Sequence, residues 1–296
     1  MKQLVVISGK GGTGKTVISA SFATLVQKKV MADCDVDAAN LYLLLHPEIR
    51  EEHTFSAGKK AIVDLEKCTA CGNCLDLCRF SAISEREDGK VSIDPISCEG
   101  CGVCSYICPV EAILMENSIS GKWFVSQTKY GPFVHARLGI GEENSGKLVT
   151  EVRKKAKEIA EKNGLDLVII DGPPGIGCPV IASLSGVDMA LIVTEPTLSG
   201  IHDMERVIKV AHHFRTKTAC SINKFDLNLR LSAQIEDWCH KNFVPVVGKI
   251  PFDEVVTESI AQGITITEYK ESSVSKEIKN MWKRLSELLS AEDSKR

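Results

Sequence analysis

A glycine-rich loop near the N-terminus constrains this chain more than any other feature. An apolar run, Leu4–Ile7, is typical of a buried strand in a parallel sheet, and a helical pattern of apolar residues begins after Thr16. Between them lies the pattern G-x-x-x-x-G-K-[ST], whose glycines let backbone N–H groups converge on phosphate oxygens. In this motif Lys15 reaches the β- and γ-phosphates, and the Thr16 hydroxyl binds Mg²⁺. The context predicts a nucleoside triphosphate site at Gly9, Lys10, Gly11, Gly12, Thr13, Gly14, Lys15 and Thr16.

Lys10 narrows the class of nucleotide-binding protein. With this lysine the loop has the form K-G-G-x-G-K-T, which resembles the deviant Walker A motif of the MinD/ParA family of ATPases. The resemblance implies a nucleotide-dependent homodimer in which Lys10 reaches across to the nucleotide of the other subunit. From the residues alone, an exposed loop lysine is the alternative.

Acidic residues follow two further strands, at the edge of the sheet where such folds bind ligands. Asp33 and Asp35 come after a short predicted strand at 30–32, and Asp171 ends the buried run 165–170 in a Walker B pattern. The resemblance implies that Asp35 positions the attacking water, that Asp33 supports the magnesium shell and that Asp171 holds Mg²⁺. For the first pair, a solvated acidic turn is the alternative.

Two later segments are expected to lie near the base of the nucleotide. Residues 223–226 match the N-K-x-D pattern with which GTPases read guanine, whereas in the resembled ATPases an asparagine here, Asn223, meets adenine. The same resemblance implies that Pro251 borders the base. Because the other motifs match the ATPase family, we expect Mg-ATP as the ligand.

Eight of the twelve cysteines form two runs that repeat thirty residues apart. Each run has the spacing C-x-x-C-x-x-C-x-x-x-C, which resembles the bacterial ferredoxin with two [4Fe–4S] clusters. In such ferredoxins the fourth cysteine of each run binds the other cluster. Paired zinc sites are the alternative, because C-x-x-C pairs also bind zinc. The resemblance implies one cluster on Cys68, Cys71, Cys74 and Cys108, and a second on Cys98, Cys101, Cys104 and Cys78.

The 296 residues, 44% hydrophobic and 25% charged, leave room for about two domains. Strands and helices alternate after the cysteine runs, as in parallel sheets. We therefore predict an α/β fold, a doubly wound and mostly parallel-sheet P-loop NTPase domain at 1–58 and 118–296, with a small α+β ferredoxin domain inserted at 59–117. The stretch 139–146 is expected to be a loop. The last helix, near 273–289, is expected to pack its apolar stripe on the sheet.

Charge and hydropathy restrict the partners. A net charge of −3 gives no reason to expect nucleic acid or an anionic membrane. No run approaches the length of a membrane span, and no signal peptide is evident, so we expect a cytoplasmic protein. In that reducing compartment the cysteines favour metal over disulfides. Cys178 follows Asp171 by seven residues, an offset similar to that of a cluster-binding cysteine in the nitrogenase iron protein; a structural thiol and a role at a dimer interface both stay open.

Two functions are consistent with these motifs. The first is an ATPase that couples nucleotide binding and hydrolysis to electron transfer, through two [4Fe–4S] clusters, to a redox partner protein. The second is a carrier or scaffold that acts with a partner in iron–sulfur or metal-cofactor assembly. We favour the first because a module that supplies all eight ligands holds its clusters firmly.

Overall fold

The structure is a computed structural model of the chain and describes residues 1–139 and 144–291. The chain forms two compact units. Unit 1 comprises residues 1–53, 123–137 and 145–296, and unit 2 comprises residues 54–122 and 138–144. The module expected at 59–117 falls wholly within unit 2. Of the expected loop at 139–146, residues 140–143 lie outside the described residues.

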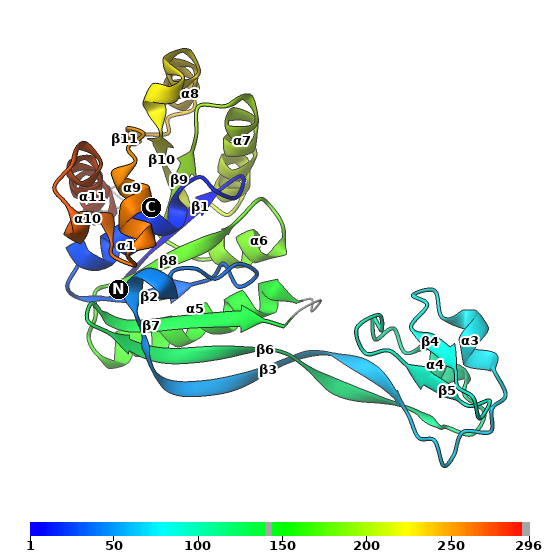
Figure 1. Cartoon of the computed structure of the whole chain (residues 1–296). Coiled ribbons are helices and arrows are strands. Elements are labelled where there is room, and N and C mark those ends of the chain that lie inside the picture. Colours follow the sequence, from blue (N-terminus) through cyan, green and yellow to red (C-terminus); the bar gives the residue numbers. More distant parts are fainter. Residues whose placement is uncertain (140–143, 292–296) are drawn as a thin grey trace. The chain divides into compact units, whose positions relative to one another are not determined.

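Among the described residues, nine strands form one sheet in the order β11-β10-β9-β1-β8-β2-β7-β6-β3 (Figure 1). Most of this sheet lies in unit 1, whereas residues 54–63 of β3 and 113–122 of β6 belong to unit 2. From β11 to β7 each strand is parallel to its neighbour, and β6 joins β7 through a two-residue turn. The predicted α/β fold with a mostly parallel sheet is therefore confirmed. The strands are β1 (Lys2–Ser8), β2 (Lys29–Asp33), β3 (Glu48–Val63), β6 (Ile113–Thr128), β7 (Gly131–Leu138), β8 (Leu167–Pro174), β9 (Met189–Thr194), β10 (Lys217–Asn223) and β11 (Val246–Ile250).

Helices pack on both faces of this sheet, as a doubly wound fold requires. On one face α1, α9, α10 and α11 cover a core that contains Leu4, Phe22 and Ile169. On the other face α5 and α6 pack on β2 and β8, and α7 and α8 pack on β9 and β10. The helices of unit 1 are α1 (Lys15–Leu25), α2 (Tyr42–Leu45), α5 (Ser145–Lys162), α6 (Cys178–Leu184), α7 (Leu198–His213), α8 (Leu229–Lys241), α9 (Val255–Ala261), α10 (Ile266–Tyr269) and α11 (Ser273–Ser290), with a 3₁₀ turn at Phe225–Leu227.

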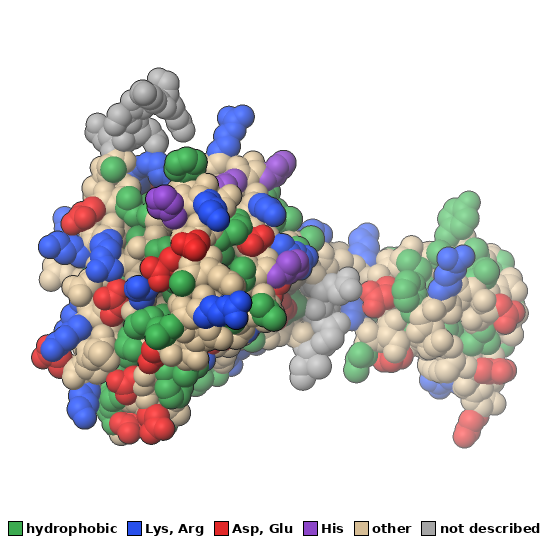
Figure 2. Space-filling view, turned by 90° about the horizontal axis from the view of Figure 1, so that it is seen from above, with side chains coloured by type: hydrophobic (Ala, Val, Ile, Leu, Met, Phe, Trp, Pro, Cys, Tyr) green, Lys and Arg blue, Asp and Glu red, His purple; other side chains and the backbone are tan. Residues whose placement is uncertain are grey.

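The apolar stripe of α11 packs on the sheet, as predicted. Ile278, Met281 and Leu285 are fully buried, and the ring of Trp282 lies 4.9 Å from that of Phe22 on α1. Within the described ranges, no helix combines the length and apolarity needed to cross a membrane. On the face that Figure 2 draws, Lys and Arg side chains are interspersed with Asp and Glu side chains.

Unit 2 is a small α+β unit. Its two helices, α3 (Asn73–Leu77) and α4 (Val103–Ile107), start thirty residues apart, and a hairpin of β4 (Ile83–Glu85) and β5 (Val91–Ile93) lies between them in the chain. Its core contains Ala61, Ile83, Val91 and Ile113 together with most of the cysteines of the two runs.

The backbone of unit 2 follows the sequence repeat and crosses between its halves. The N–H of Asp64 donates to the carbonyl of Ala112 at 2.7 Å, and the N–H of Asp94 donates to the carbonyl of Ala82 at 2.8 Å. These two bonds are equivalent under a shift of thirty residues, and each joins the start of one cysteine run to the end of the other. The two halves of the repeat are therefore joined by a pair of equivalent backbone hydrogen bonds.

Candidate functional site

The loop 9–14 connects β1 to α1 at the carboxyl edge of the sheet. Gly12 and Gly14 adopt positive φ angles of 77° and 91°, and a Cβ at Gly14 would lie 2.4 Å from the side-chain nitrogen of Asn223. Only glycine fits that conformation and that approach. Helix α1 starts at Lys15, so its unpaired N–H groups face the loop, as a phosphate site requires.

Lys15 forms an ion pair with Asp35 across this site. Its Nζ lies 3.7 Å from Asp35 Oδ2, and the two side chains are only 5% and 12% exposed. Burial raises the pKa of Asp35 to about 6, against the opposing effect of the Lys15 charge. The carboxylate is therefore ionised at neutral pH, but its burial makes the ionised form energetically unfavourable.

Asp33 orders the segment that carries Asp35. One carboxylate oxygen accepts the N–H of Asp35 at 3.1 Å, and the other accepts the N–H of Leu41 at 3.3 Å. Asp33 is fully buried, and burial together with the nearby charge of Asp171 raises its pKa well above the ordinary value. Both oxygens therefore hold the backbone of the segment from 33 to 41 in place.

Asp171 has a free oxygen that fits a cation. Its Oδ1 accepts the Ser19 hydroxyl at 2.8 Å, and the Thr16 hydroxyl lies close enough to the same carboxylate to lower its pKa. Its Oδ2 is buried and has no hydrogen-bond partner among the described residues. Burial raises the pKa of Asp171, although the charge of Lys15 and both hydroxyls lower it. A hydroxyl and a carboxylate are oxygen ligands of the kind that Mg²⁺ takes, so these residues fit the predicted ion.

The two segments expected near the base contact each other, and Asn223 connects them to the phosphate loop. The side-chain amide of Asn223 donates to the Thr13 carbonyl at 2.8 Å. The Asp226 carboxylate accepts the N–H of Phe252 at 2.7 Å, next to Pro251. One oxygen of Asp226 is thereby occupied by the chain's own backbone.

Lys10 contacts residues that follow β9. Its Nζ lies 3.5 Å from Glu195 Oε2 and donates to the Thr197 hydroxyl at 3.2 Å and to the Ser199 hydroxyl at 3.5 Å. Neither Glu195 nor Ser19 was predicted from the sequence. For Glu195 the available signal was its place directly after the apolar strand 189–194, at the same edge as Asp33 and Asp171.

In unit 2 three cysteines of the first set, Cys68, Cys74 and Cys108, belong to one packed cluster. Burial raises the pKa of the Cys74 thiol, and the charges of Cys71, Cys68 and Cys108 raise it further. The N–H of Ala112 donates to the sulfur of Cys108 at 3.2 Å.

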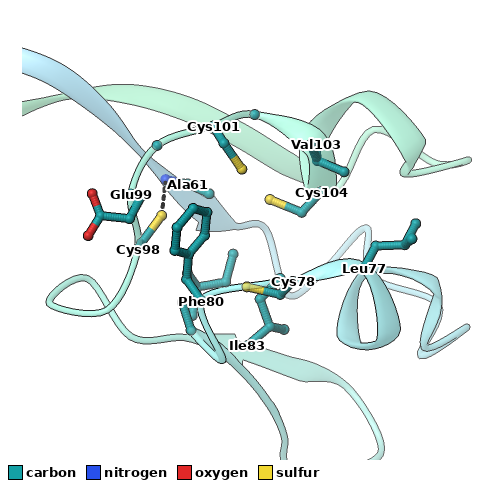
Figure 3. A pocket seen from close by; sticks show the side chains of 14 residues that line it. Ala61, Leu77, Cys78, Phe80, Ile83, Cys98, Glu99, Cys101, Val103 and Cys104 are labelled. Carbon is teal, nitrogen blue, oxygen red and sulfur yellow. Dashed lines mark hydrogen bonds between the residues drawn. The ribbon is translucent and has the colours of Figure 1, made fainter.

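The second set, Cys78, Cys98, Cys101 and Cys104, lines one pocket (Figure 3). Phe80, Leu77 and Val103 are among the apolar side chains of its wall. The N–H of Ala61 donates to the sulfur of Cys98 at 3.5 Å.

One pocket thus brings Cys78 of the first run together with Cys98, Cys101 and Cys104 of the second run. In the parts of the chain described, no group of three or more His, Cys, Asp or Glu side chains is arranged so that it could hold a metal ion.

The four remaining cysteines lie in unit 1. Cys34, Cys220 and Cys239 are buried, and Cys178 is exposed at the start of α6. Burial raises the pKa of Cys34, so this thiol is neutral.

This fold and this site define a P-loop nucleotide-binding protein. Comparison with known proteins gives the family. A model described as the CobQ/CobB/MinD/ParA nucleotide binding domain matches residues 4–266, and the chain belongs to that family.

Similar proteins come from several organisms. An uncharacterized protein of Methanocaldococcus jannaschii is 36% identical over 295 residues, which is 97% of each chain. The septum site-determining protein MinD of Thermotoga maritima is 23% identical and covers 95% of this chain and 87% of its own. The structure of MinD from Pyrococcus horikoshii, complexed with Mg-ADP, shares the fold with a TM-score of 0.60 at 19% identity, covering 98% of this chain and 97% of its own.

MinD and ParA proteins are ATPases with a P-loop nucleotide-binding domain. The prediction of an ATP-binding ATPase of the MinD/ParA type is therefore confirmed. The names of the relatives described above say nothing of iron–sulfur clusters.

Proposed function

We propose that this chain is an iron–sulfur ATPase in which ATP binding and hydrolysis gate electron transfer, through two [4Fe–4S] clusters, to a partner protein. The observation that supports it most is that cysteines of both runs share one packed cluster, in which Cys108 joins Cys68 and Cys74, and that Cys78 lines the same pocket as Cys98, Cys101 and Cys104. A ferredoxin with two clusters needs this pairing. Two unrelated zinc sites formed by the separate runs would not need it.

The surroundings of the thiols also favour clusters. A [4Fe–4S] cluster takes four thiolates, and N–H groups that donate to the sulfurs stabilise its charge. Each cysteine set has four thiols and receives one such N–H, from Ala112 or from Ala61. When bound, the clusters supply one-electron chemistry; the chain supplies the ligands, the N–H donors and the apolar wall.

For hydrolysis we assign roles from the geometry of unit 1. When nucleotide binds, Lys15 donates to the β- and γ-phosphates, and this competition weakens its ion pair with Asp35. Asp35, ionised above its pKa of about 6, is then free to accept a hydrogen bond from the attacking water. Thr16 and the free oxygen of Asp171 hold Mg²⁺. Asn223 and Pro251 border the base.

The active form is a homodimer that ATP closes, and Lys10 of each subunit completes the site of the other. A cation supplied in this way can raise the rate by about 10³ to 10⁵.

Anaerobic purification tests the iron–sulfur part. We expect about eight irons and eight sulfides per chain. Cys74→Ser should remove at least half of the iron, whereas Cys239→Ser, a buried thiol outside both sets, should retain it. Stoichiometric zinc with little iron would refute the proposal.

Reduction of the clusters by a chemical donor, followed by transfer to the products of neighbouring genes, tests the coupling. Transfer should require Mg-ATP, and Lys15→Ala should abolish transfer while keeping all the iron. Transfer at the same rate without ATP would remove the gating role.

The exposure of Cys178 favours the carrier or scaffold as a second candidate, because cluster handover needs an accessible ligand. The two functions differ in what leaves the chain. A carrier loses iron to an acceptor that lacks clusters, whereas an electron-transfer protein reduces its partner and keeps its iron.

A further inference from the structure

Glu195 joins the two loops on either side of it. It directly follows β9, whose neighbours in the sheet are β1 and β10. The loop after β1 carries Lys10, and the loop after β10 carries Lys224. Glu195 therefore lies between a residue assigned to the partner's phosphates and a residue of the segment that faces the base.

Each oxygen of the Glu195 carboxylate contacts one of these lysines. Oε1 accepts from Lys224 Nζ at 2.6 Å, and Oε2 lies 3.5 Å from Lys10 Nζ. The Glu195 side chain is only 14% exposed, against 31% for Lys10 and 34% for Lys224. Water therefore screens these two ion pairs less than it screens pairs on the open surface.

Lys224 is held in place from its other side. Its backbone is in the left-handed region, at a φ of 53°, and its N–H donates to the side-chain oxygen of Asn223 at 3.0 Å. The amide of Asn223 is in turn bound to the Thr13 carbonyl. A chain of polar contacts thus runs from the phosphate loop through Asn223 and Lys224 to Glu195 and Lys10.

We propose that Glu195 is a positioning residue that holds Lys10 within its own subunit, and that Lys224 determines how firmly it does so. The inference rests on the proposed role of Lys10 in the partner's site. To reach that site, Lys10 must leave Glu195. Because Glu195 is shared with Lys224, and because the two lysines repel each other, the contact to Lys10 is weaker than a simple pair would be.

This arrangement predicts effects of opposite sign for two substitutions. Glu195→Gln keeps the size of the side chain but removes its charge, so Lys10 is released and the dimer should tighten. Lys224→Gln removes the competing and repelling charge, so Lys10 is held more firmly and the dimer should weaken. A merely structural role for this contact network predicts that both substitutions weaken the dimer.

The measurement is the dimer dissociation constant by analytical ultracentrifugation, in an Asp35→Ala background at saturating Mg-ATP. Saturation removes any effect on nucleotide affinity. We expect Glu195→Gln to tighten the dimer at least about fivefold and Lys224→Gln to weaken it at least about threefold, the scale of an incompletely screened ion pair. Glu205→Gln is the matched control, since Glu205 pairs with Lys209 at 3.9 Å on the surface of α7 and should change nothing beyond about twofold.

Two further variants separate the inference from the function on which it rests. If the Asp35→Ala parent stays monomeric with ATP, the proposed ATP-dependent dimer and the inference about Glu195 are both overturned. If the parent dimerises and Lys10→Ala abolishes the dimer, the proposed trans role stands. In that case an unchanged constant in Glu195→Gln, or shifts of the same sign in both variants, overturns this inference alone.

Discussion

Replacing Asp35 by asparagine should stabilise the nucleotide-free protein. Burial raises the pKa of Asp35 from an ordinary value of 3.8 to about 6, so folding disfavours the ionised carboxylate. One pKa unit corresponds to about 1.36 kcal/mol, and the side chain is 12% exposed, which gives a cost of about 2 to 3 kcal/mol at neutral pH. Asparagine has nearly the same shape without the charge, and should recover most of that cost.

The sign of the pH dependence follows from linkage. Between the unfolded pKa near 3.8 and the folded pKa near 6, the folded protein binds more protons than the unfolded chain, so its stability falls as the pH rises. The gain from Asp35→Asn should therefore be negligible below about pH 4, reach about half its size near pH 5 and be complete above about pH 6.

Urea unfolding followed by tryptophan fluorescence measures this gain. Trp123, Trp238 and Trp282 are the three tryptophans of the chain and all lie in unit 1, so the signal reports the unit that contains Asp35. Asp237→Asn, the same change at an exposed position on α8, should alter stability by less than about 0.5 kcal/mol. A gain that is equal at pH 5 and pH 7.5, or a loss at pH 7.5, would refute the reasoning. Hydrolysis should fall in the stabilised variant by at least about 10²-fold, because the group that orients water is lost.

Three other outcomes follow from the structure. A Cβ at Gly100 would lie 1.9 Å from the Lys59 carbonyl, so Gly100→Ala should lower the amount of iron retained after anaerobic gel filtration. Gly102 has a similar positive φ but lies in open space, so Gly102→Ala should retain more iron. Equal losses of iron in the two variants would contradict the predicted clash. Because one oxygen of Asp226 accepts a backbone N–H, ATP should outcompete GTP in an equilibrium binding assay, and Asp226→Ala should preserve that order; a reversal on substitution would show that Asp226 selects the base. Cys178→Ser should keep iron and ATPase activity and cost less than about 1 kcal/mol in unfolding free energy, whereas loss of electron transfer with all irons present would assign Cys178 a functional role.

The nucleotide site was predictable where its chemistry is local in the sequence. The loop from Gly9 to Thr16 needs positive φ angles and an unobstructed backbone, and glycine is the residue that meets both needs. Asp171 was predictable because a carboxylate at the end of a buried strand, in a chain with a phosphate loop, is typical of a magnesium ligand. The stripe of α11 has a period that only a helix packed on one face satisfies.

The remainder depends on contacts that no local pattern encodes. Glu195 is 185 residues away from Lys10 in the chain, and it acquires its role from the order of three strands. Ser19 is an ordinary residue of a helix until the fold brings Asp171 within 2.8 Å of it. The strand β3 was missed because its long polar part, from Glu48 to His53, lacks the alternation that marks a half-buried strand.

The crossed backbone bonds of unit 2 have a consequence for how the module fails. The segment that precedes each cysteine run is anchored on a carbonyl beyond the other run, through Asp64 and Ala112 on one side and Asp94 and Ala82 on the other. Neither half can then open without releasing an anchor of its neighbour. If clusters fill both sets, damage to one, for instance by oxygen, should destabilise the second. Preparations exposed to oxygen should then contain chains with both clusters and chains with none, but few with one. The iron content of such a preparation should therefore measure the fraction of chains that keep both clusters, not a partial loss of iron from every chain.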